Sequence, residues 1–239
     1  MKKVLIFAMV AGISLGACKK DDDNDGQPAY VEPENISTQN ANDDAAIAKY
    51  LDEHYLNSQG KIMSFTATET PENHPRLSSM NPLKLSSGVV VILREGAQPE
   101  NGRSIGDTDI IRIMHHTGTF LSNLEDGKAN YISELVFGNT IDGSGAPQND
   151  PSFYFASAKT LSESGKARDF YEIEGFREGL KHFKSCEIPD SQNYNLQGVI
   201  IVPSRAAFAR DAHYPYGSTS WRNRNFVFNF QVYKTSERK

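Results

Sequence analysis

The sequence predicts an α+β domain in which one short helix lies across a mostly antiparallel sheet, with an extra helix before it. Two observations predict the sheet: residues 88–96 and 195–202 are β-branched apolar runs bounded by turn residues, and residues 225–233 alternate between apolar and polar side chains. A third observation predicts the helices, because residues 43–56 and 175–183 follow a helical period.

The chain begins with the pattern of an export signal. Lys2-Lys3 precede an apolar run over residues 4–15, and small residues lead to Cys18. This pattern predicts a signal peptide over residues 1–17 with a lipoprotein cleavage box. The run is shorter than the roughly 20 apolar residues that a membrane span needs. We therefore expect lipidation of Cys18 and an outer-membrane lipoprotein facing the periplasm or the cell surface.

A polar segment over residues 18–42 follows, and its composition predicts a disordered, lipid-anchored linker. Its charged start, Lys19 to Asp25, resembles the surface-export signal of lipoproteins in the Bacteroidetes. Asp21 to Glu32 also matches the spacing of a calcium-binding EF-hand loop. Pro28 and the lack of flanking amphipathic helices argue against calcium, although the sequence leaves the question open.

Charge and cysteine content exclude several classes of function. Removal of Lys2 and Lys3 takes the formal charge from -5 to -7, so no basic field is available to hold nucleic acid. With Cys18 lipidated, Cys186 is the one remaining thiol, which excludes a disulfide framework and a cysteine-type zinc site. We expect no metal and no cofactor.

Residues 43–86 predict the extra helix and then an irregular extension. Asn42 is a capping residue for the helix over 43–56, whose apolar residues recur at helical spacing. Prolines interrupt the rest of this segment, although residues 61–68 fit a short strand. The remaining strands and the second helix fall within residues 87–235, with one more strand over 108–119.

Four motifs in residues 87–235 occur in an informative order: His115-His116-Thr117-Gly118, Ile173 to Leu180, Pro203 to Phe208 and Phe226 to Phe230. Together they resemble an FKBP-type peptidyl-prolyl isomerase domain. The resemblance implies an FKBP-like antiparallel sheet wrapped around one short helix.

Such an enzyme lowers the barrier to rotation about X-Pro bonds, and peptide rotation in general faces about 18–20 kcal/mol. Neither an acid, a base nor a metal is required. The site must fit the twisted amide better than the planar one, using an apolar pocket and a few fixed donors.

The resemblance implies particular site residues. The catalytic set is Asp142, Phe208 and His116. The substrate-binding set is Ile141, Phe153, Ile173, Phe176, His213 and Phe228.

Within these sets, Phe176 stands where the family has its pocket-floor tryptophan, and the Ile173 N–H would hold a substrate carbonyl. Phe208 replaces a tyrosine and lacks its hydroxyl. Two choices stay open: Asp126 competes with Asp142 for the acid of the family's Phe-Asp-Ser-Ser motif, and Phe155 competes with Phe153.

Each aromatic residue could also serve core packing alone, because an alternating apolar strand looks the same in any half-buried sheet. The enzyme interpretation therefore requires Asp142, Phe176, Phe208 and Phe228 to meet in one open pocket with the Ile173 N–H pointing in.

Other chemistries are disfavoured. His115 and His116 are adjacent on a strand and point to opposite faces, so they cannot share a metal. The sequence contains neither a Gly-x-Ser-x-Gly elbow nor a Gly-Lys-Ser/Thr phosphate loop.

The leading hypothesis is thus a peptidyl-prolyl isomerase of low activity, or folding helper, that acts on proline-containing segments of exported proteins and reaches the membrane through its lipid anchor. The alternatives are a non-catalytic FKBP-like binding or chaperone module, and an accessory subunit of an outer-membrane complex.

Overall fold

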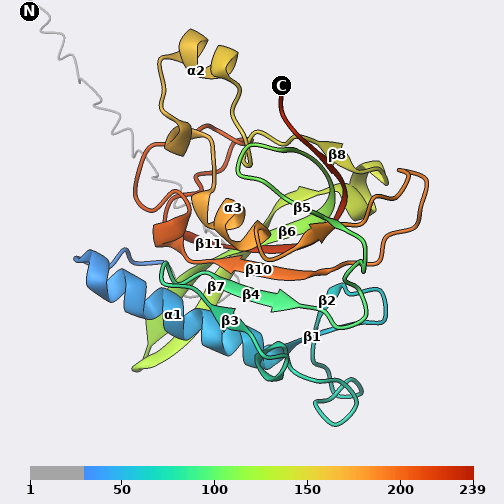
Figure 1. Cartoon of the computed structure of the whole chain (residues 1–239). Coiled ribbons are helices and arrows are strands. Elements are labelled where there is room, and N and C mark those ends of the chain that lie inside the picture. The colour runs from blue at the N-terminus through green and yellow to red at the C-terminus, as the bar shows by residue number, and fades with distance from the viewer. Residues whose placement is uncertain (1–29) are drawn as a thin grey trace, which may run out of the picture.

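A computed structural model describes residues 30–239. The signal peptide, Cys18 and the first part of the linker lie outside the described residues. Figure 1 shows a central sheet with helix α1 (Ile36–Glu53) below it and helix α3 (Glu174–Leu180) above it. The prediction of an α+β chain with a mostly antiparallel sheet is confirmed.

The central sheet is antiparallel throughout. Its spatial order is β3 (Leu83–Lys84), β4 (Val90–Leu93), β10 (Gly198–Val202), β11 (Arg224–Ser236), β6 (Ile110–Glu125) and β7 (Lys128–Asn139), and β8 (Gln148–Asn149) pairs with β6. Two small sheets join β1 (His54–Leu56) to β2 (Ile62–Ser64) and β5 (Arg103–Ser104) to β9 (Lys184–Ser185). The strand predicted over residues 61–68 is shorter, because the chain turns after Ser64.

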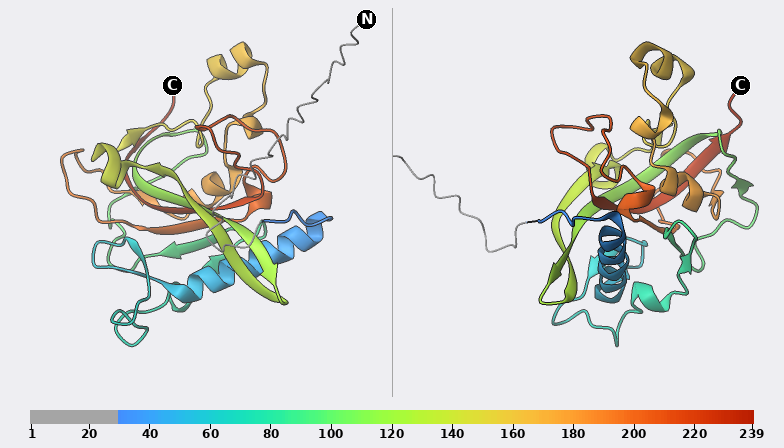
Figure 2. Two further views of the ribbon diagram at one scale, coloured as in Figure 1. Left: turned by 180° about the vertical axis from the view of Figure 1, so that it is seen from behind. Right: turned by 90° about the vertical axis from the view of Figure 1, so that its left-hand side faces the viewer.

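Both faces of the sheet are covered, which gives three layers. Along β10, Ile200 and Val202 belong to the core under α3, whereas Val199 and Ile201 pack with α1. A strand buried on both sides is expected to be a continuous apolar run, as β10 is. The right-hand view of Figure 2 shows α1 nearly end-on beneath the sheet and α3 above it.

Two glycines let α3 lie close to the sheet. A Cβ on Gly175 would stand 2.5 Å from Val202 Cγ1, and one on Gly179 would stand 2.7 Å from Ile200 Cγ2. Real Cβ atoms do not approach so closely, so both positions require glycine. The Gly-x-x-x-Gly spacing places both glycines on the face that meets β10.

Helix α1 begins at Ile36, which corrects the predicted start at residue 43 and shortens the predicted linker. Asn35 is the N-cap, and its Oδ1 accepts a hydrogen bond from the Thr38 N–H at 2.8 Å. Gln39 falls within the predicted linker and Asp43 at the predicted start of the helix, and both are buried. Gln39 hydrogen-bonds to Tyr30 and Asp43, whereas Asp43 also accepts from Ser122 of β6 and Asn225 of β11, which local sequence does not reveal.

The remaining helical segments are α2 (Ala158–Ser164) and the short turns η1 (Leu77–Ser79), η2 (Thr140–Ser144), η3 (Arg168–Phe170) and η4 (Ser204–Ala206). The predicted helix over 175–183 is α3, which ends at Leu180. Across residues 30–239, none of the helices has the length and apolar character that crossing a membrane requires.

Candidate functional site

The sheet separates the site residues that the sequence predicts. His116 and Asp142 line a hollow on the face that carries α1. Phe153, Phe176 and Phe228 belong to the core on the opposite face, under α3. The single open pocket that the enzyme interpretation requires is therefore not formed by these residues.

Asp142 lies in η2 and is turned toward the β1–β2 hairpin. Asn139 Oδ1 accepts hydrogen bonds from the N–H groups of Ile141 and Asp142, each at 3.0 Å, which fixes the turn. The Asp142 carboxylate pairs with Lys61 Nζ at 3.1 Å, and this hydrogen bond lowers the pKa of the carboxyl. Ile141 is buried against Met114, Leu196 and Tyr233 on the same side. Neither residue faces the aromatic core.

The predicted aromatic residues form a closed core instead of a pocket surface. Phe176 and Phe228 stack with ring centroids 4.3 Å apart, and both are fully buried. Phe208 is 3% exposed. The Ile173 N–H donates to Phe153 O at 2.7 Å, so it is not free to hold a substrate carbonyl. Core packing, the alternative left open for these aromatics, is what the structure shows.

The loop over residues 207–223 closes this core from outside. Trp221 packs edge-on against Phe137 with ring centroids 5.0 Å apart, and its Nε1–H donates to Tyr216 O at 2.8 Å. His213 Nε2 accepts from the Trp221 N–H at 3.0 Å, while Nδ1 donates to Tyr214 O at 2.8 Å. Because a backbone carbonyl can only accept, His213 carries its proton on Nδ1. The histidine therefore holds the loop in place rather than facing a ligand.

An open hollow of about 550 Å³ lies beside this core. We call it the aromatic cup and define it by His115, Phe137, Phe153 and Tyr216. Phe153 is the one predicted site residue that lines it. Phe176 and Phe228 lie directly behind Phe153, each with its ring centroid 5.7 Å away. Thus Phe176 and Phe228 support the floor of the cup without forming its surface.

The titratable groups of the cup are uncharged at neutral pH. Burial lowers the pKa of His115 to about 4. Its Nδ1 lies 2.8 Å from Thr117 Oγ1 and its Nε2 lies 3.3 Å from Gln148 Oε1, an arrangement that a neutral imidazole with its proton on Nε2 satisfies. Burial raises the pKa of Tyr216, whose hydroxyl donates to Tyr171 O at 2.8 Å. Such a surface suits an apolar, uncharged ligand.

Sequence reasoning missed Phe137, Tyr216 and the orientation of His115. Phe137-Gly138-Asn139-Thr140 shares only its phenylalanine with the Phe-Asp-Ser-Ser motif, and it has glycine at the second position. A Cβ on Gly138 would stand 2.9 Å from His115 Cε1, so His115 occupies the room that a side chain there would need.

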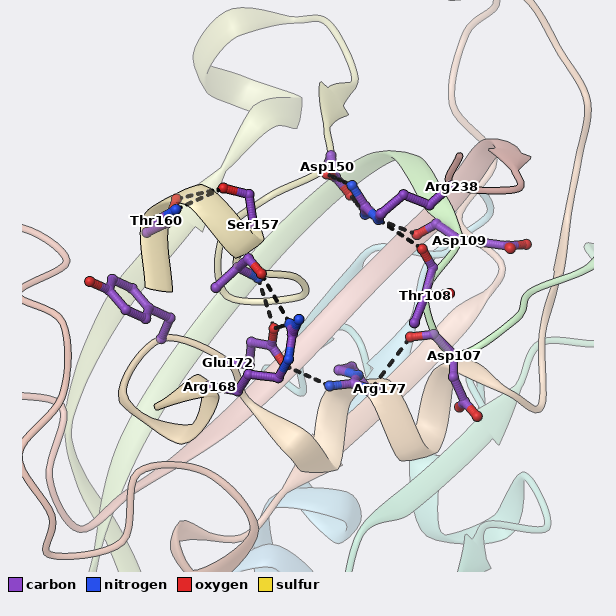
Figure 3. Close-up of polar contacts among 12 residues, drawn as sticks. Asp107, Thr108, Asp109, Asp150, Ser157, Thr160, Arg168, Glu172, Arg177 and Arg238 are labelled. Carbon is purple, nitrogen blue, oxygen red and sulfur yellow. Dashed lines mark hydrogen bonds and ion pairs between the residues drawn. The ribbon is translucent and has the colours of Figure 1, made fainter. Parts of the chain in front are cut away.

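Glu172 stands where the resemblance has valine, and it forms a buried ion-pair cluster next to α3 (Figure 3). Its carboxylate is 3% exposed and accepts from Arg168 Nη1 at 2.6 Å, from Arg177 Nη1 and from the Ala156 N–H at 2.8 Å. The cluster fixes the segment that leads into α3.

Phe155, the alternative to Phe153, lies outside the cup between two guanidinium groups. Arg238 is 3.6 Å and Arg168 is 4.6 Å from its ring centroid. Its ring is therefore engaged with cations, which leaves Phe153, in the turn over residues 151–155, as the aromatic that a ligand in the cup would meet.

Within residues 30–239, no group of three or more His, Cys, Asp and Glu side chains is placed to hold a metal ion. Glu32, the last position of the calcium-like spacing, pairs with Arg210 Nη1 at 3.4 Å and accepts a hydrogen bond from Asn223. The other acidic positions of that spacing lie outside the described residues.

Comparison with known proteins does not define a family. No family model matches the chain, and no curated protein matches it. Among solved structures, the crystal structure of FkpA from Escherichia coli is similar over 64% of this chain and 51% of that chain, at 18% identity and a TM-score of 0.36. The matched region is thus about half the length of that protein, and the TM-score is too low to show a common fold.

Proposed function

We propose that the chain is a folding helper with an FKBP-like domain, and that it holds proline-containing segments in the aromatic cup with little or no isomerase activity. The observation that carries the proposal is the composition of the cup, in which aromatic faces and neutral polar groups surround an open hollow of about 550 Å³. Proline-rich segments bind grooves lined by aromatic side chains, because the proline ring is apolar and already restricted in conformation.

The same geometry argues for binding over catalysis. Stabilising a twisted amide requires fixed donors aimed at its carbonyl oxygen. The Ile173 N–H already donates to Phe153 O, and the Tyr216 hydroxyl already donates to Tyr171 O. Gly138 supplies no acid, and Asp142 lies on the other face of the sheet. A proline ring would find apolar contact here but few free donors.

The lipid anchor at Cys18, the outer-membrane location and the exported clients remain part of the proposal. They rest on the sequence pattern of the first residues.

Titration of the full chain with a proline tetrapeptide tests the binding claim. Phe137→Ala should weaken binding about tenfold, because about 1.4 kcal/mol is comparable to the loss of one aromatic contact. Phe65→Ala is the matched control, because Phe65 is a partly buried aromatic on the hairpin near Tyr55, away from the cup. A peptide with alanine in place of proline should bind more weakly to the parent protein. Equal loss in both variants, or no binding, would contradict the proposal.

The catalytic alternative is tested by measuring cis/trans isomerisation of the same peptide without a coupling protease. The parent should give no acceleration. Acceleration that Phe137→Ala abolishes would make the cup an isomerase site. Acceleration that only Asp142→Ala abolishes would move the site to the other face and overturn the proposal.

A further inference from the structure

The face of the sheet opposite the cup contains a groove that α1 leaves uncovered. Two adjoining hollows, of about 350 and 250 Å³, are both lined by Tyr50, His116, Gly118, Glu134 and Val227. We call them together the sheet-face groove and define it by these five residues. Its floor is β6 and β11, and its walls are α1 and the edge strand β7.

Gly118 makes the floor of the groove unusually low. It lies inside β6, paired with Val227 of β11 and Val136 of β7. A Cβ built on it would meet nothing within 4 Å. Glycine weakens a strand interior, and it often marks a place where a ligand or another chain approaches closely. The pairing of β6 with β7 shifts register between Thr117 and Gly118, although Gly118 itself does not have a positive φ.

The unmatched charge in the groove is negative. Glu134 makes no hydrogen bond or ion pair to any residue from 30 to 239, and desolvation raises the pKa of its carboxyl although part of the residue is exposed. The other charges are compensated: Lys61 Nζ already pairs with Asp142 at 3.1 Å, and burial lowers the pKa of His116 and favours its neutral form. One positive charge on a ligand would satisfy Glu134.

The hollow toward β7 is lined mainly by apolar groups, whereas polar residues that include Lys61, Ser64 and Asn229 line the hollow toward the β1–β2 hairpin. Tyr50 stacks on Phe120 with ring centroids 5.5 Å apart, and both line the groove beside Glu134. On the rim, Leu135 and Val136 of β7 are 40% and 57% exposed. A ligand should therefore combine a flexible aliphatic stem with a terminal cation, and the exposed rim suits a ligand that continues as a polypeptide.

We propose that the sheet-face groove binds the aliphatic ammonium group of a lysine side chain, presented by an extended polypeptide segment, with Glu134 as counter-ion and the lysine stem above Gly118. This site is independent of the aromatic cup, since it lies on the other face of the sheet and shares no lining residue with the cup.

The test titrates the full chain with three peptides of the form Ac-Val-X-Val-NH2, where X is lysine, norleucine or glutamate. The lysine peptide should bind, the norleucine peptide should bind at least about fivefold more weakly, and the glutamate peptide should not bind. Titration with hexylammonium shows whether the groove recognises any alkylammonium group or a lysine within a polypeptide. If hexylammonium binds as tightly as the lysine peptide, the rim contributes nothing and the polypeptide part of the proposal is wrong.

Two variants test whether the lysine peptide binds in the sheet-face groove. Glu134→Gln should weaken the lysine peptide about five- to tenfold and leave the norleucine peptide unchanged. Glu163→Gln is the matched control, because Glu163 is an exposed glutamate on α2 that pairs only loosely with Lys159, at 3.8 Å. Gly118→Val should fill the groove and abolish binding of the lysine peptide while the fold is kept, because its Cβ meets no atom.

Proline-peptide binding should be the same in both groove variants, which separates this proposal from that of the cup. If Gly118→Val fails to fold, the affinity of Glu134→Gln for the lysine peptide still tests the proposal. Lysine-peptide affinity that Glu134→Gln does not change, or norleucine binding equal to lysine binding, would overturn the proposal.

Discussion

Asp43→Ala should be among the most damaging single substitutions in this chain, although the sequence places Asp43 at the edge of a polar linker. The Asp43 side chain is buried, with the residue 0% exposed. Its carboxylate accepts from Gln39 Nε2 at 2.9 Å, Ser122 Oγ at 2.7 Å, Asn225 Nδ2 at 3.2 Å and the Ser204 hydroxyl. One carboxylate thus ties α1 to β6, β11 and η4.

The expected cost follows from the donors left behind. Removing the carboxylate leaves four buried donors without an acceptor, and each unsatisfied donor costs about 1–3 kcal/mol. Hydroxyl groups can rotate toward other acceptors, and water can enter the space, so the sum is an upper limit. We expect Asp43→Ala to lower the free energy of unfolding by about 3–5 kcal/mol. Asp43→Asn keeps one acceptor oxygen and should cost about 1–2 kcal/mol.

Urea unfolding of the full chain, followed by the fluorescence of Trp221 and by circular dichroism, measures these losses. Asp52→Ala is the control, since Asp52 lies on the same helix with an exposed side chain. It should change stability by no more than about 0.5 kcal/mol. If Asp43→Ala cost no more than Asp52→Ala, α1 would not be an integral layer of the domain.

Two further predictions concern the core and the cup. His115 has a pKa of about 4 in the folded chain, whereas a histidine in the unfolded chain has a pKa near 6.5. Between these two pH values the unfolded chain binds a proton at this residue and the folded chain does not. The free energy of unfolding therefore falls as the pH drops from 6.5 to 4. Between pH 7.5 and pH 5, urea unfolding of the parent should lose about 1–2 kcal/mol more than His115→Gln, and equal losses would contradict a buried neutral imidazole. Gly175→Ala should cost about 2 kcal/mol or more in the same assay, because its Cβ would stand 2.5 Å from Val202 Cγ1 and 2.9 Å from Ala206 O. Gly143→Ala, where a Cβ meets nothing within 4 Å, should be close to neutral.

The strands were predictable because their signals are local. The continuous run in β10 and the alternation in β11 each specify a strand, although the polar residues Asn225, Asn229 and Gln231 of β11 are buried as well. The layer formed by α1 was not predictable in the same way. Its position depends on Asp43 meeting Ser122, Ser204 and Asn225, which are far away in the sequence.

The site was harder to predict because a shift of one residue on a strand moves a side chain to the other face of the sheet. The resemblance selected His116, but His115 points toward Phe153 and His116 toward α1. Similarly, the acid of the family motif indicates Asp142, whereas the β7 end that lines the cup has Phe137 and Gly138. The register of β6 decides the face for the two histidines, whereas Asp142 lies in η2, after the end of β7.

This alternation gives the two proposed sites a common wall but separate lining residues. Along β11, Phe226 and Phe228 lie in the core behind the cup, whereas Val227 lines the sheet-face groove. Adjacent residues of β6 divide in the same way, with His115 in the cup and His116 in the groove. Because adjacent positions serve opposite faces, either binding surface can change by substitution while the other keeps its side chains.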